Sequence, residues 1–377
     1  MPDTASLETP ALLLDEARMQ RNIARMKAKL AAAGVVFRPH VKTNKCIEVA
    51  RRLMSTPEGP ITVSTLHEAE YFAAHGVRDM LYAVAIAPGK LAHVAALLAR
   101  GVRMTIVLDS MAAAQQVAAF ARSSGRRFAA MMEIDCDGHR SGLAPDAAAL
   151  VPLGTFMHGQ GIDLAGVMTH AGSSYNCKGS NAITAMAEQE RLAVVTAASA
   201  LHAAGLPCPV VSVGSTPTAL FAESFAGVTE VRAGVFVFFD LVMAGLGVCK
   251  TADIALSVLT TVIGHQRDKG WTIVDAGWMA MSRDRGTASQ PVDQGYGLVC
   301  DEGGRVLDDY IMAQANQEHG IIAHRSGDPA RTLDLPLGTQ LRILPNHACA
   351  TGAQYPRYTV LDDRGGIAAT WERSNGW

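Results

Sequence analysis

The sequence lacks several features that mark large classes of proteins. No uninterrupted apolar run approaches the roughly 20 residues that span a bilayer, because Arg, Gln or Ser breaks the Ala-rich stretches. The segment from Met1 to Pro10 shows no basic region followed by an apolar run, so we expect no secretory signal. Aromatic residues make up only 6% of the chain and the formal net charge is -2, which gives no indication of a nucleic-acid or membrane partner.

The cysteines are few and irregularly placed. Seven of them are scattered along the chain, at positions 46, 136, 177, 208, 249, 300 and 349. An odd number without regular spacing is typical of a reducing compartment and argues against a disulfide framework. We therefore expect a cytoplasmic protein.

What the sequence does contain is a regular alternation of strand-like and helical segments. Eight short runs resemble strands, at 35–37, 61–64, 80–84, 104–108, 129–134, 164–169, 210–213 and 229–231. Helical patterns lie between them, for example at 90–100, 111–123 and 182–204. Eight such units over about 240 residues are typical of a closed parallel (β/α)8 barrel. An open doubly wound sheet is the alternative, and the absence of Gly-x-Gly-x-x-Gly after the first strand weakens it.

The pattern changes from about Asp253. Short β-type runs at 256–263, 271–274, 310–312 and 341–344 follow without long helices between them, and Gly-rich turns such as Gly303-Gly304 separate them. We therefore predict an α/β protein with a barrel at residues 15–255. A C-terminal β domain is predicted at residues 256–377, joined by residues 1–14, in which Ala11–Leu14 is the expected strand.

Lys42 stands where a barrel places its chemistry. The first strand-like run, at 35–37, leads through Arg38-Pro39-His40-Val41 into this lysine. The carboxyl ends of barrel strands carry active sites. A lysine among partly apolar neighbours can form a Schiff base, although an ordinary solvated lysine is the simpler interpretation of this segment alone. Gly214-Ser215-Thr216 and Gly234 follow the seventh and eighth strands, where barrels often bind a phosphate. Together these segments favour a phosphate-bearing aldehyde as the ligand.

Four motifs give the chain a resemblance to a known family. They are Arg38-Pro39-His40-Val41-Lys42, Glu133-Ile134-Asp135 with Gly138-His139-Arg140-Ser141-Gly142, Thr169-His170-Ala171-Gly172-Ser173-Ser174-Tyr175, and Pro345-Asn346-His347-Ala348-Cys349. With them the chain resembles the fold-type III pyridoxal phosphate enzymes, which have an alanine-racemase-like barrel and a β domain. Within these it is similar to the group of D-serine dehydratases and D-threonine aldolases. The resemblance extends over nearly the whole chain, from Thr9 to Arg373.

The resemblance implies roles for residues around the cofactor. Lys42 would be the Schiff-base lysine, Arg140 would approach the phenolic oxygen, and His170 would stack on the ring. The residues that would hold the phosphate are Gly214, Ser215, Thr216, Gly234 and Val235.

Three further positions carry less specific implications. Arg232 falls where alanine racemase keeps an arginine on the pyridine nitrogen, which would leave that nitrogen unprotonated and weaken the electron sink. Relatives in the dehydratase and aldolase group vary at this position. Tyr175 would contact the cofactor or serve in packing, and His139 is interpreted as a loop histidine.

His347 and Cys349 form a His-x-Cys pair after the run at 341–344. Zn²⁺ accepts both ligand types, but two ligands do not fill a tetrahedral site, and a buried cysteine beside a loop histidine is the commoner interpretation of the motif alone. The resemblance implies a catalytic zinc on this pair, with Mn²⁺ or another divalent ion as the alternative. His319 and Asp275 also lie in segments similar to family motifs, but a charged surface loop and a tight turn would explain them equally.

The implied activity is that of a lyase. A dehydratase dependent on pyridoxal phosphate and zinc would convert a 3-hydroxy-D-amino acid, such as D-threo-3-hydroxyaspartate to oxaloacetate and ammonia, and D-serine to pyruvate and ammonia. One alternative is a metal-dependent aldolase of D-threonine or 3-hydroxy-D-aspartate. Another is a non-catalytic pyridoxal phosphate carrier, which would not need residues 256–377. A homodimer is implied by fold analogy. The cation for a second substrate carboxylate stays open among Arg283, Arg285 and His319.

Overall fold

The computed structural model describes residues 4–377, and the contacts within it form two compact units. One unit contains residues 25–234 together with Gly376 and Trp377, and the other contains the chain up to Ala24 and residues 235–375. These limits differ from the predicted ones at residues 15 and 255. Helix α1 (Glu16–Ala32) begins in one unit and ends in the other, and residues 235–255 have their contacts within the same unit as residues 256–375. Of the segment 1–14, residues 1–3 lie outside the described residues. The assignment of the cofactor to residues 15–255, and of the metal to residues 256–377 with residues 1–14, stays a prediction.

The first unit is built around parallel strands. Its strands are β2 (Val36–Phe37), β3 (Ile61–Val63), β4 (Asp79–Ala85), β5 (Arg103–Leu108), β6 (Ala129–Ile134), β7 (Asp163–Thr169), β8 (Val210–Val213) and β9 (Glu230–Val231). Their order in this 8-stranded sheet is β2-β9-β8-β7-β6-β5-β4-β3, and a parallel bridge between His40 and Thr62 links its two ends. Strands in sequence order with joined ends form a closed barrel. This confirms the predicted (β/α)8 architecture and excludes the doubly wound alternative.

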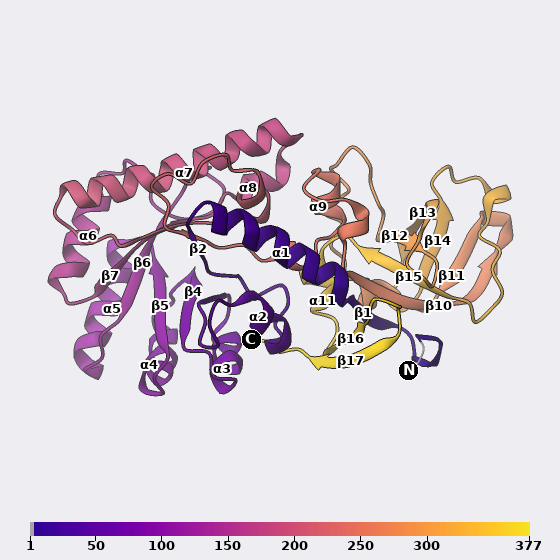
Figure 1. Ribbon diagram of the computed structural model, residues 1–377, viewed down its shortest axis with the longest axis horizontal. Coiled ribbons are helices and arrows are strands. Elements are labelled where there is room, and N and C mark those ends of the chain that lie inside the picture. The colour runs from indigo at the N-terminus through magenta and orange to yellow at the C-terminus, as the bar shows by residue number, and fades with distance from the viewer. Residues whose placement is uncertain (1–3) are drawn as a thin grey trace. The chain divides into compact units, whose positions relative to one another are not determined.

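Helices connect the successive strands. After α1 they are α2 (Ile47–Leu53), α3 (Leu66–Ala74), α4 (Leu91–Ala99), α5 (Met111–Ser124), α6 (Leu150–Gly159), α7 (Ser180–Ala203) and α8 (Thr216–Phe221). Figure 1 shows them around the outside of the strands, with the long helix α7 along one side. The hydroxyls of Thr65, Ser110 and Ser215 each accept the backbone N–H three residues later, which fixes where α3, α5 and α8 begin.

The second unit is dominated by an antiparallel sheet. Its strands are β1 (Ala11–Asp15), β10 (Leu256–Gln266), β11 (Trp271–Val274), β12 (Gly297–Cys300), β13 (Val306–Ala315), β14 (Gly320–His324), β15 (Gln340–Pro345), β16 (Arg357–Leu361) and β17 (Ile367–Glu372). The order of this 9-stranded sheet is β11-β14-β13-β12-β15-β10-β1-β16-β17, and β11 also pairs with β10. Short helices α9 (Leu241–Gly245), α10 (Trp278–Met281) and α11 (Ala348–Gly352) accompany it.

The opening strand β1 lies inside this sheet, as expected from its sequence. It pairs antiparallel with β10 and parallel with β16, and Figure 1 shows the indigo β1 beside the yellow β16. Leu12, Leu13 and Leu14 are all at most 2% exposed, so both faces of the strand are covered. Burial on both faces explains why the run is continuously apolar and does not alternate.

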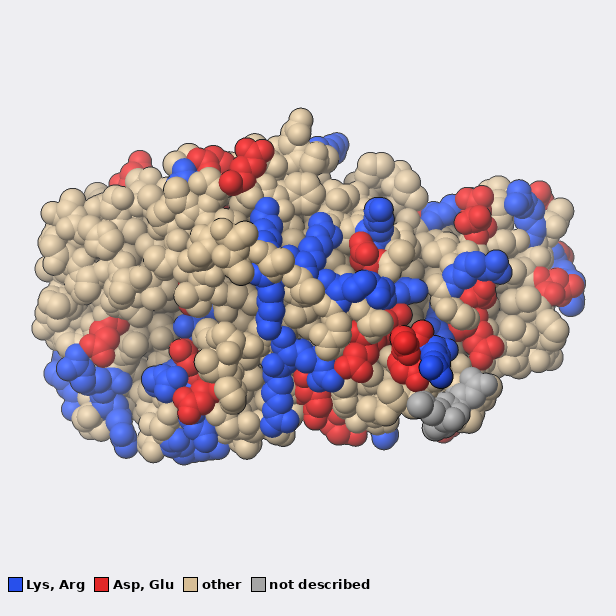
Figure 2. Space-filling model, viewed as in Figure 1, with Lys and Arg blue, Asp and Glu red and all other residues tan. Residues whose placement is uncertain are grey.

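The surface carries both signs of charge. Figure 2 shows basic side chains in a line near the middle of the face in view, with acidic side chains directly beside them. Within residues 4–377, no helix combines the length and the apolar character needed to cross a bilayer.

Candidate cofactor and metal sites

Lys42 lies in the turn between β2 and α2. Its side chain is exposed, while Val41, Thr43 and Asn44 around it are buried. The N–H of Val41 donates to the carbonyl of Thr62, and the N–H of Thr62 donates to the carbonyl of Pro39. The contacts that close the barrel therefore also fix this turn, and they present the lysine at the carboxyl end of the strands.

Two histidines with depressed pKa values lie at the same end of the barrel. The Nδ1 atom of His170, after β7, contacts the carbonyl oxygen of Gly214, after β8. Since a carbonyl can only accept, Nδ1 carries the proton in the neutral ring and Nε2 is left as an acceptor. Burial lowers the pKa of His170 to about 4 and lowers the pKa of His40 well below its usual value. Both imidazoles are therefore neutral at pH 7.

Glu190 of α7 anchors the backbone of Gly214 through a hydrogen bond. The Oε1 atom of Glu190 accepts the N–H of Ala171 at 2.9 Å and the N–H of Gly214 at 3.1 Å. A Cβ at Gly214 would lie 1.9 Å from the carbonyl oxygen of Arg232, so only glycine fits. The N–H of Gly214 is thus directed to Glu190. The missing side chain of Gly214 allows its backbone to lie close to the backbone of Arg232.

Small hydroxyl residues and a second glycine complete this end of the barrel. Ser215 caps α8, with its Oγ accepting the N–H of Thr218 at 3.2 Å, and it lies 3.0 Å from the Oγ of Ser174. Thr216, next to it, is buried. A Cβ at Gly234 would lie 2.8 Å from the carbonyl oxygen of His40, so this loop packs against the turn that carries Lys42. Glycines and hydroxyls gathered in this way are an environment in which proteins bind phosphate.

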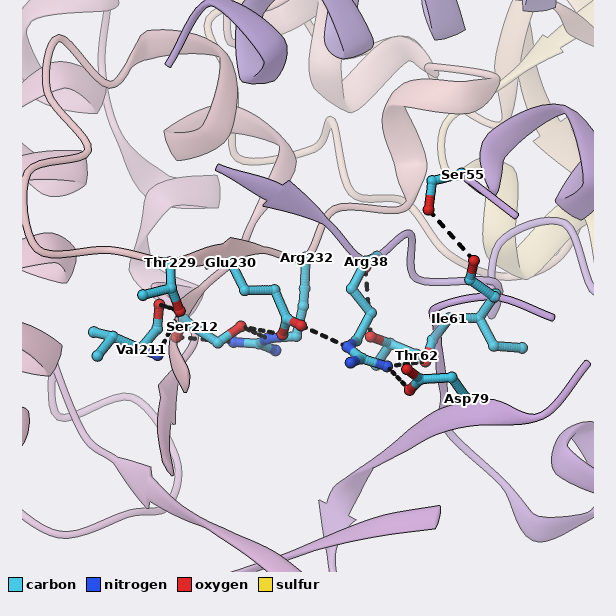
Figure 3. Close-up of polar contacts among 11 residues, drawn as sticks. Arg38, Ser55, Ile61, Thr62, Asp79, Val211, Ser212, Thr229, Glu230 and Arg232 are labelled. Carbon is cyan, nitrogen blue, oxygen red and sulfur yellow. Dashed lines mark hydrogen bonds and ion pairs between the residues drawn. The ribbon is translucent and has the colours of Figure 1, made fainter. Parts of the chain in front are cut away.

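Arg232 lies at one end of a chain of polar contacts inside the barrel (Figure 3). Its Nε donates to the Oγ of Ser212 at 2.9 Å, and this hydroxyl donates to Oε1 of Glu230 at 2.7 Å. Oε2 of Glu230 accepts from Nε of Arg38 at 2.7 Å, and Arg38 also donates to Asp79 at 2.6 Å. Two carboxylates thus balance the buried guanidinium group of Arg232 and the partly buried one of Arg38.

One nitrogen of Arg232 remains for a ligand. Its Nη2 contacts the carbonyl oxygen of Thr169, and Nε is engaged by Ser212. Within residues 4–377 no hydrogen bond is found for Nη1. Because the side chain is only 4% exposed, Nη1 is a fixed and directed donor.

The loops after β6 and β7 hold the remaining residues predicted around the cofactor. Arg140 is exposed, and its Nη2 lies 3.4 Å from Oε1 of the buried Glu133. The ring of His139 packs on Gly172, where a Cβ would lie 2.3 Å from a ring carbon. Tyr175 is partly buried in the 3-10 turn Gly172–Asn176. Val235 is buried at the start of the 3-10 turn Val235–Val237.

In the second unit, His347 and Cys349 lie at the start of α11. Nδ1 of His347 donates to Oδ2 of Asp284 at 2.6 Å, and its ring is within hydrogen-bond reach of the Cys349 thiol. Burial opposes the charged imidazole, but Cys349, Asp284 and the buried Asp240 outweigh it and raise the pKa of His347 to about 11. The Asp240 carboxylate caps α9 and also accepts the N–H of Ala348 at 3.0 Å, which anchors the motif.

These donors fit an open metal site. Engagement of Nδ1 by a carboxylate leaves Nε2 of His347 for an ion, the arrangement that commonly orients metal-binding histidines. Among the described residues, no group of three or more His, Cys, Asp or Glu could hold a metal ion. A closed structural site is therefore not built from the described part of this chain, and a two-ligand site would leave positions for water or substrate.

Asp275 and His319, the two less specific candidates of the sequence, have different surroundings. The carboxylate of Asp275 accepts from Thr9 at 2.5 Å, from Thr260 at 2.7 Å and from the N–H of Thr261 at 2.9 Å. It therefore ties β10 and β11 to the N-terminal segment. His319 is exposed in the turn between β13 and β14.

Sequence reasoning missed the acidic residues that support both sites. Glu190 stands in an Ala-rich helix where a glutamate resembles a solvated residue, and Asp284 stands between two arginines that suggest a surface loop. Glu230 had a usable signal, because a carboxylate between Thr229 and Val231 in a short buried strand requires a partner.

Comparison with known proteins gives consistent matches. The family model described as alanine racemase, N-terminal domain, matches residues 14–242, and the one described as putative serine dehydratase domain matches residues 255–361. D-threo-3-hydroxyaspartate dehydratase of Delftia sp. (strain HT23) is 57% identical over 100% of both chains. D-serine dehydratase of Dictyostelium discoideum is 28% identical, covering 100% of this chain and 98% of that protein.

Solved structures agree with these matches. The Delftia sp. HT23 dehydratase superposes with a TM-score of 0.96 over 100% of both chains, at 57% identity. D-threonine aldolase of Filomicrobium marinum has a TM-score of 0.83 at 23% identity, covering 98% of this chain and 96% of that chain, and so shares the fold. A D-threo-3-hydroxyaspartate dehydratase variant with a cysteine replaced by alanine is described as metal-free, and a second variant replaces the histidine two positions earlier.

Proposed function

Because the chain belongs to the fold-type III pyridoxal phosphate enzymes with an alanine-racemase-like barrel and a serine dehydratase domain, we propose that it is a metal-dependent dehydratase of 3-hydroxy-D-amino acids. The observation that carries this proposal is the 57% identity to D-threo-3-hydroxyaspartate dehydratase over 100% of both chains. The proposed reaction converts D-threo-3-hydroxyaspartate to oxaloacetate and ammonia, with D-serine as a second substrate that gives pyruvate. The proposed form is a cytoplasmic homodimer.

The carboxyl end of the barrel fits pyridoxal phosphate. Lys42 is exposed for an aldehyde, and the Cβ clashes at Gly214 and Gly234 show that the chain is shaped without side chains at these positions. We assign Lys42 to the covalent bond, the His170 ring and Tyr175 to the cofactor ring, and Arg140 to its phenolic oxygen. Nη1 of Arg232 is the donor for the pyridine nitrogen. The residues assigned to the phosphate are Gly214, Ser215, Thr216, Gly234 and Val235.

The His-x-Cys pair fits a divalent metal, for which we propose Zn²⁺. Nε2 of His347 and the Cys349 thiolate are the ligands, and Asp284 orients the imidazole. The metal-free cysteine variant of the related dehydratase supports this assignment, since the replaced residues have the same spacing as His347 and Cys349.

The chain's own residues then have defined tasks. When bound, pyridoxal phosphate supplies a sink for the electron pair of the Cα–H bond, and a divalent metal supplies a Lewis acid for the hydroxyl leaving Cβ. The Lys42 amine, once released from the aldehyde, is the base for the Cα proton. His170 does not compete for this proton, because its pKa of about 4 makes it a poor base at pH 7. With the cofactor bound, Arg232 would donate a hydrogen bond to the pyridine nitrogen and would keep that nitrogen unprotonated.

Product analysis with deuterium at Cα tests the proposed reaction. Dehydration of D-threo-3-hydroxyaspartate must break the C–D bond and release one ammonia for each oxaloacetate. An aldolase would instead give glycine and glyoxylate and would keep the deuterium at Cα, which would overturn the proposal. A carrier would bind the cofactor and give no product from this substrate, from D-serine or from D-threonine.

Metal removal tests the second cofactor separately. Chelation should abolish ammonia release while the visible absorbance of bound cofactor remains, because Lys42 and the phosphate loops do not depend on His347. Activity should return when Zn²⁺ is added. Full activity in protein shown to be metal-free would remove the metal from the proposal.

A further inference from the structure

Glu190 is a buried carboxyl that the proposed chemistry does not use. It lies in the middle of α7 and is only 1% exposed. No ion pair within residues 4–377 involves it, and the charge that acts on it from a distance is that of the buried Arg232. Its neighbours on the same face of the helix are apolar, among them Ala187, Val194 and Ala197. Packing against the barrel would therefore be served as well by an apolar side chain.

The contacts of Glu190 converge on His170 from two sides. Ala171 directly follows His170 in the chain, and its N–H donates to Oε1 of Glu190 at 2.9 Å. The N–H of Gly214 donates to the same oxygen at 3.1 Å, and the carbonyl of Gly214 accepts from Nδ1 of His170. The backbone of Ala171, next to the imidazole, and the backbone of Gly214, which accepts the imidazole proton, are thus both anchored to Oε1 of Glu190.

From this geometry we infer that Glu190 is a positioning residue that fixes the orientation and the tautomer of His170 and the place of the Gly214 loop. Its contribution is an acceptor oxygen. The inference rests on the proposed function only in that pyridoxal phosphate is the group whose ring and phosphate these two loops meet. Without the acceptor, two buried N–H groups lose their partner, and the backbone at Gly214 is held less firmly. The carbonyl that Nδ1 of His170 contacts is then no longer fixed in place.

The surroundings show why an acceptor suffices. Two backbone N–H groups share one oxygen, and the Thr218 hydroxyl is also within hydrogen-bond reach of the carboxyl. Burial raises the pKa of Glu190, which disfavours the charged form. A glutamine offers the same oxygen at nearly the same place. Glutamine should therefore replace Glu190, and an apolar residue of similar size should not.

The test compares Glu190→Gln with Glu190→Leu, and uses Glu188→Gln on the exposed face of the same helix as the control. Apoprotein labelled with ¹⁵N-histidine reports which ring nitrogen of His170 is protonated, with the signal assigned by its loss in His170→Asn. Wild type, Glu190→Gln and the control should show a protonated Nδ1, whereas Glu190→Leu should show a mixture of tautomers. Titration with pyridoxal phosphate should give a dissociation constant within about 3-fold of wild type for Glu190→Gln, and 10- to 100-fold higher for Glu190→Leu.

Each outcome is decisive. A protonated Nδ1 and unchanged cofactor affinity in Glu190→Leu would overturn the inference, and so would a Glu190→Gln protein that behaves like Glu190→Leu. If Glu190→Leu does not fold, Glu190→Met takes its place, because its flexible side chain fills the same space without an acceptor. If wild type binds no pyridoxal phosphate, the proposed function fails, but the tautomer measurement on apoprotein still tests the role of Glu190.

Discussion

The Nδ1 atom of His347 and the Oδ2 atom of Asp284 lie 2.6 Å apart, in a hydrogen bond that joins two segments 63 positions apart in the chain. This bond keeps a proton on Nδ1 of His347, because a carboxylate can only accept, and so a metal ion would bind through Nε2 in place of its proton. Asp284 is placed by a tight turn in which its own N–H donates to Oγ of Ser282 at 3.2 Å, and Ser282 adopts a φ of 74°. A non-glycine residue in that region is held there by its surroundings.

We predict that Asp284→Ala weakens metal binding about 10- to 100-fold, because the imidazole loses the partner that orients it. Asp284→Asn, which keeps an acceptor oxygen, should lose less. Competition with a chelating dye measures the dissociation constant of Zn²⁺ for each protein. Asp334→Ala is the control, since Asp334 is exposed and pairs with Arg267 elsewhere in the same unit. Metal affinity in Asp284→Ala equal to wild type would remove Asp284 from the site.

Lys42 should carry the cofactor covalently. Borohydride treatment of the yellow protein followed by peptide mapping should locate the label on Lys42, and Lys42→Ala should give no label. Lys45→Met is the matched control, because Lys45 lies three positions away and faces Glu68 at 3.4 Å. A label that persists in Lys42→Ala, or that disappears in Lys45→Met, would contradict the assignment.

His170 should make the apoprotein sensitive to acid. Burial lowers its pKa to about 4 in the folded chain, whereas an exposed histidine titrates near pH 6.5, so the unfolded chain binds more protons between these values. Stability from this group is therefore complete above pH 6.5 and falls as the pH drops toward 4, by at most about 3 kcal/mol. His40 acts in the same direction.

The corresponding experiment measures urea unfolding of the apoprotein at pH 7 and pH 4.5. His170→Gln should lose less stability between the two values than wild type, because the variant has no imidazole to protonate on unfolding. His158→Gln, at an exposed histidine of the same unit, should behave as wild type. Equal losses in His170→Gln and wild type would show that His170 is not the residue responsible.

The sequence predicted the barrel well because its strands are separate apolar runs in regular alternation with helices. All eight predicted runs overlap β2 to β9, and the run at 11–14 lies within β1. The β unit was predicted less completely. β12, β14, β16 and β17 were not anticipated, because runs such as Gly297–Cys300 are short and follow loops with no periodicity.

Local motifs in the sequence identified the residues expected at each site. They could not identify the residues that hold these side chains or their loops in position. Glu190 lies 24 positions from Gly214, and Asp284 lies 63 positions from His347. Such pairs are set by tertiary packing, and nothing in the spacing of a single sequence records it. For the same reason, only the folded chain shows that the N–H of Gly214 is directed to Glu190.

Arg283 is the best candidate for the cation that binds the second carboxylate of the substrate. Of the three cations considered, Arg285 is already paired with Asp293 at 2.5 Å, and His319 offers an imidazole, which cannot make the two-pronged contact of a guanidinium. Arg283 is exposed and stacks on Trp278, with 4.5 Å from its guanidinium carbon to the ring centroid. No ion pair of Arg283 is found in residues 4–377. It also directly precedes Asp284, the residue that holds His347.

We therefore predict that Arg283 binds the second carboxylate of D-threo-3-hydroxyaspartate. Arg283→Met should raise the KM for this substrate about 10- to 100-fold, which corresponds to the loss of a charged hydrogen bond of about 1.5–3 kcal/mol. The KM for D-serine, which has no second carboxylate, should stay within about 3-fold of wild type. Arg267→Met removes an exposed arginine of the same unit and should change neither value. An equal rise of both KM values in Arg283→Met would show general damage to the site, and no rise in either would leave the second carboxylate to another residue.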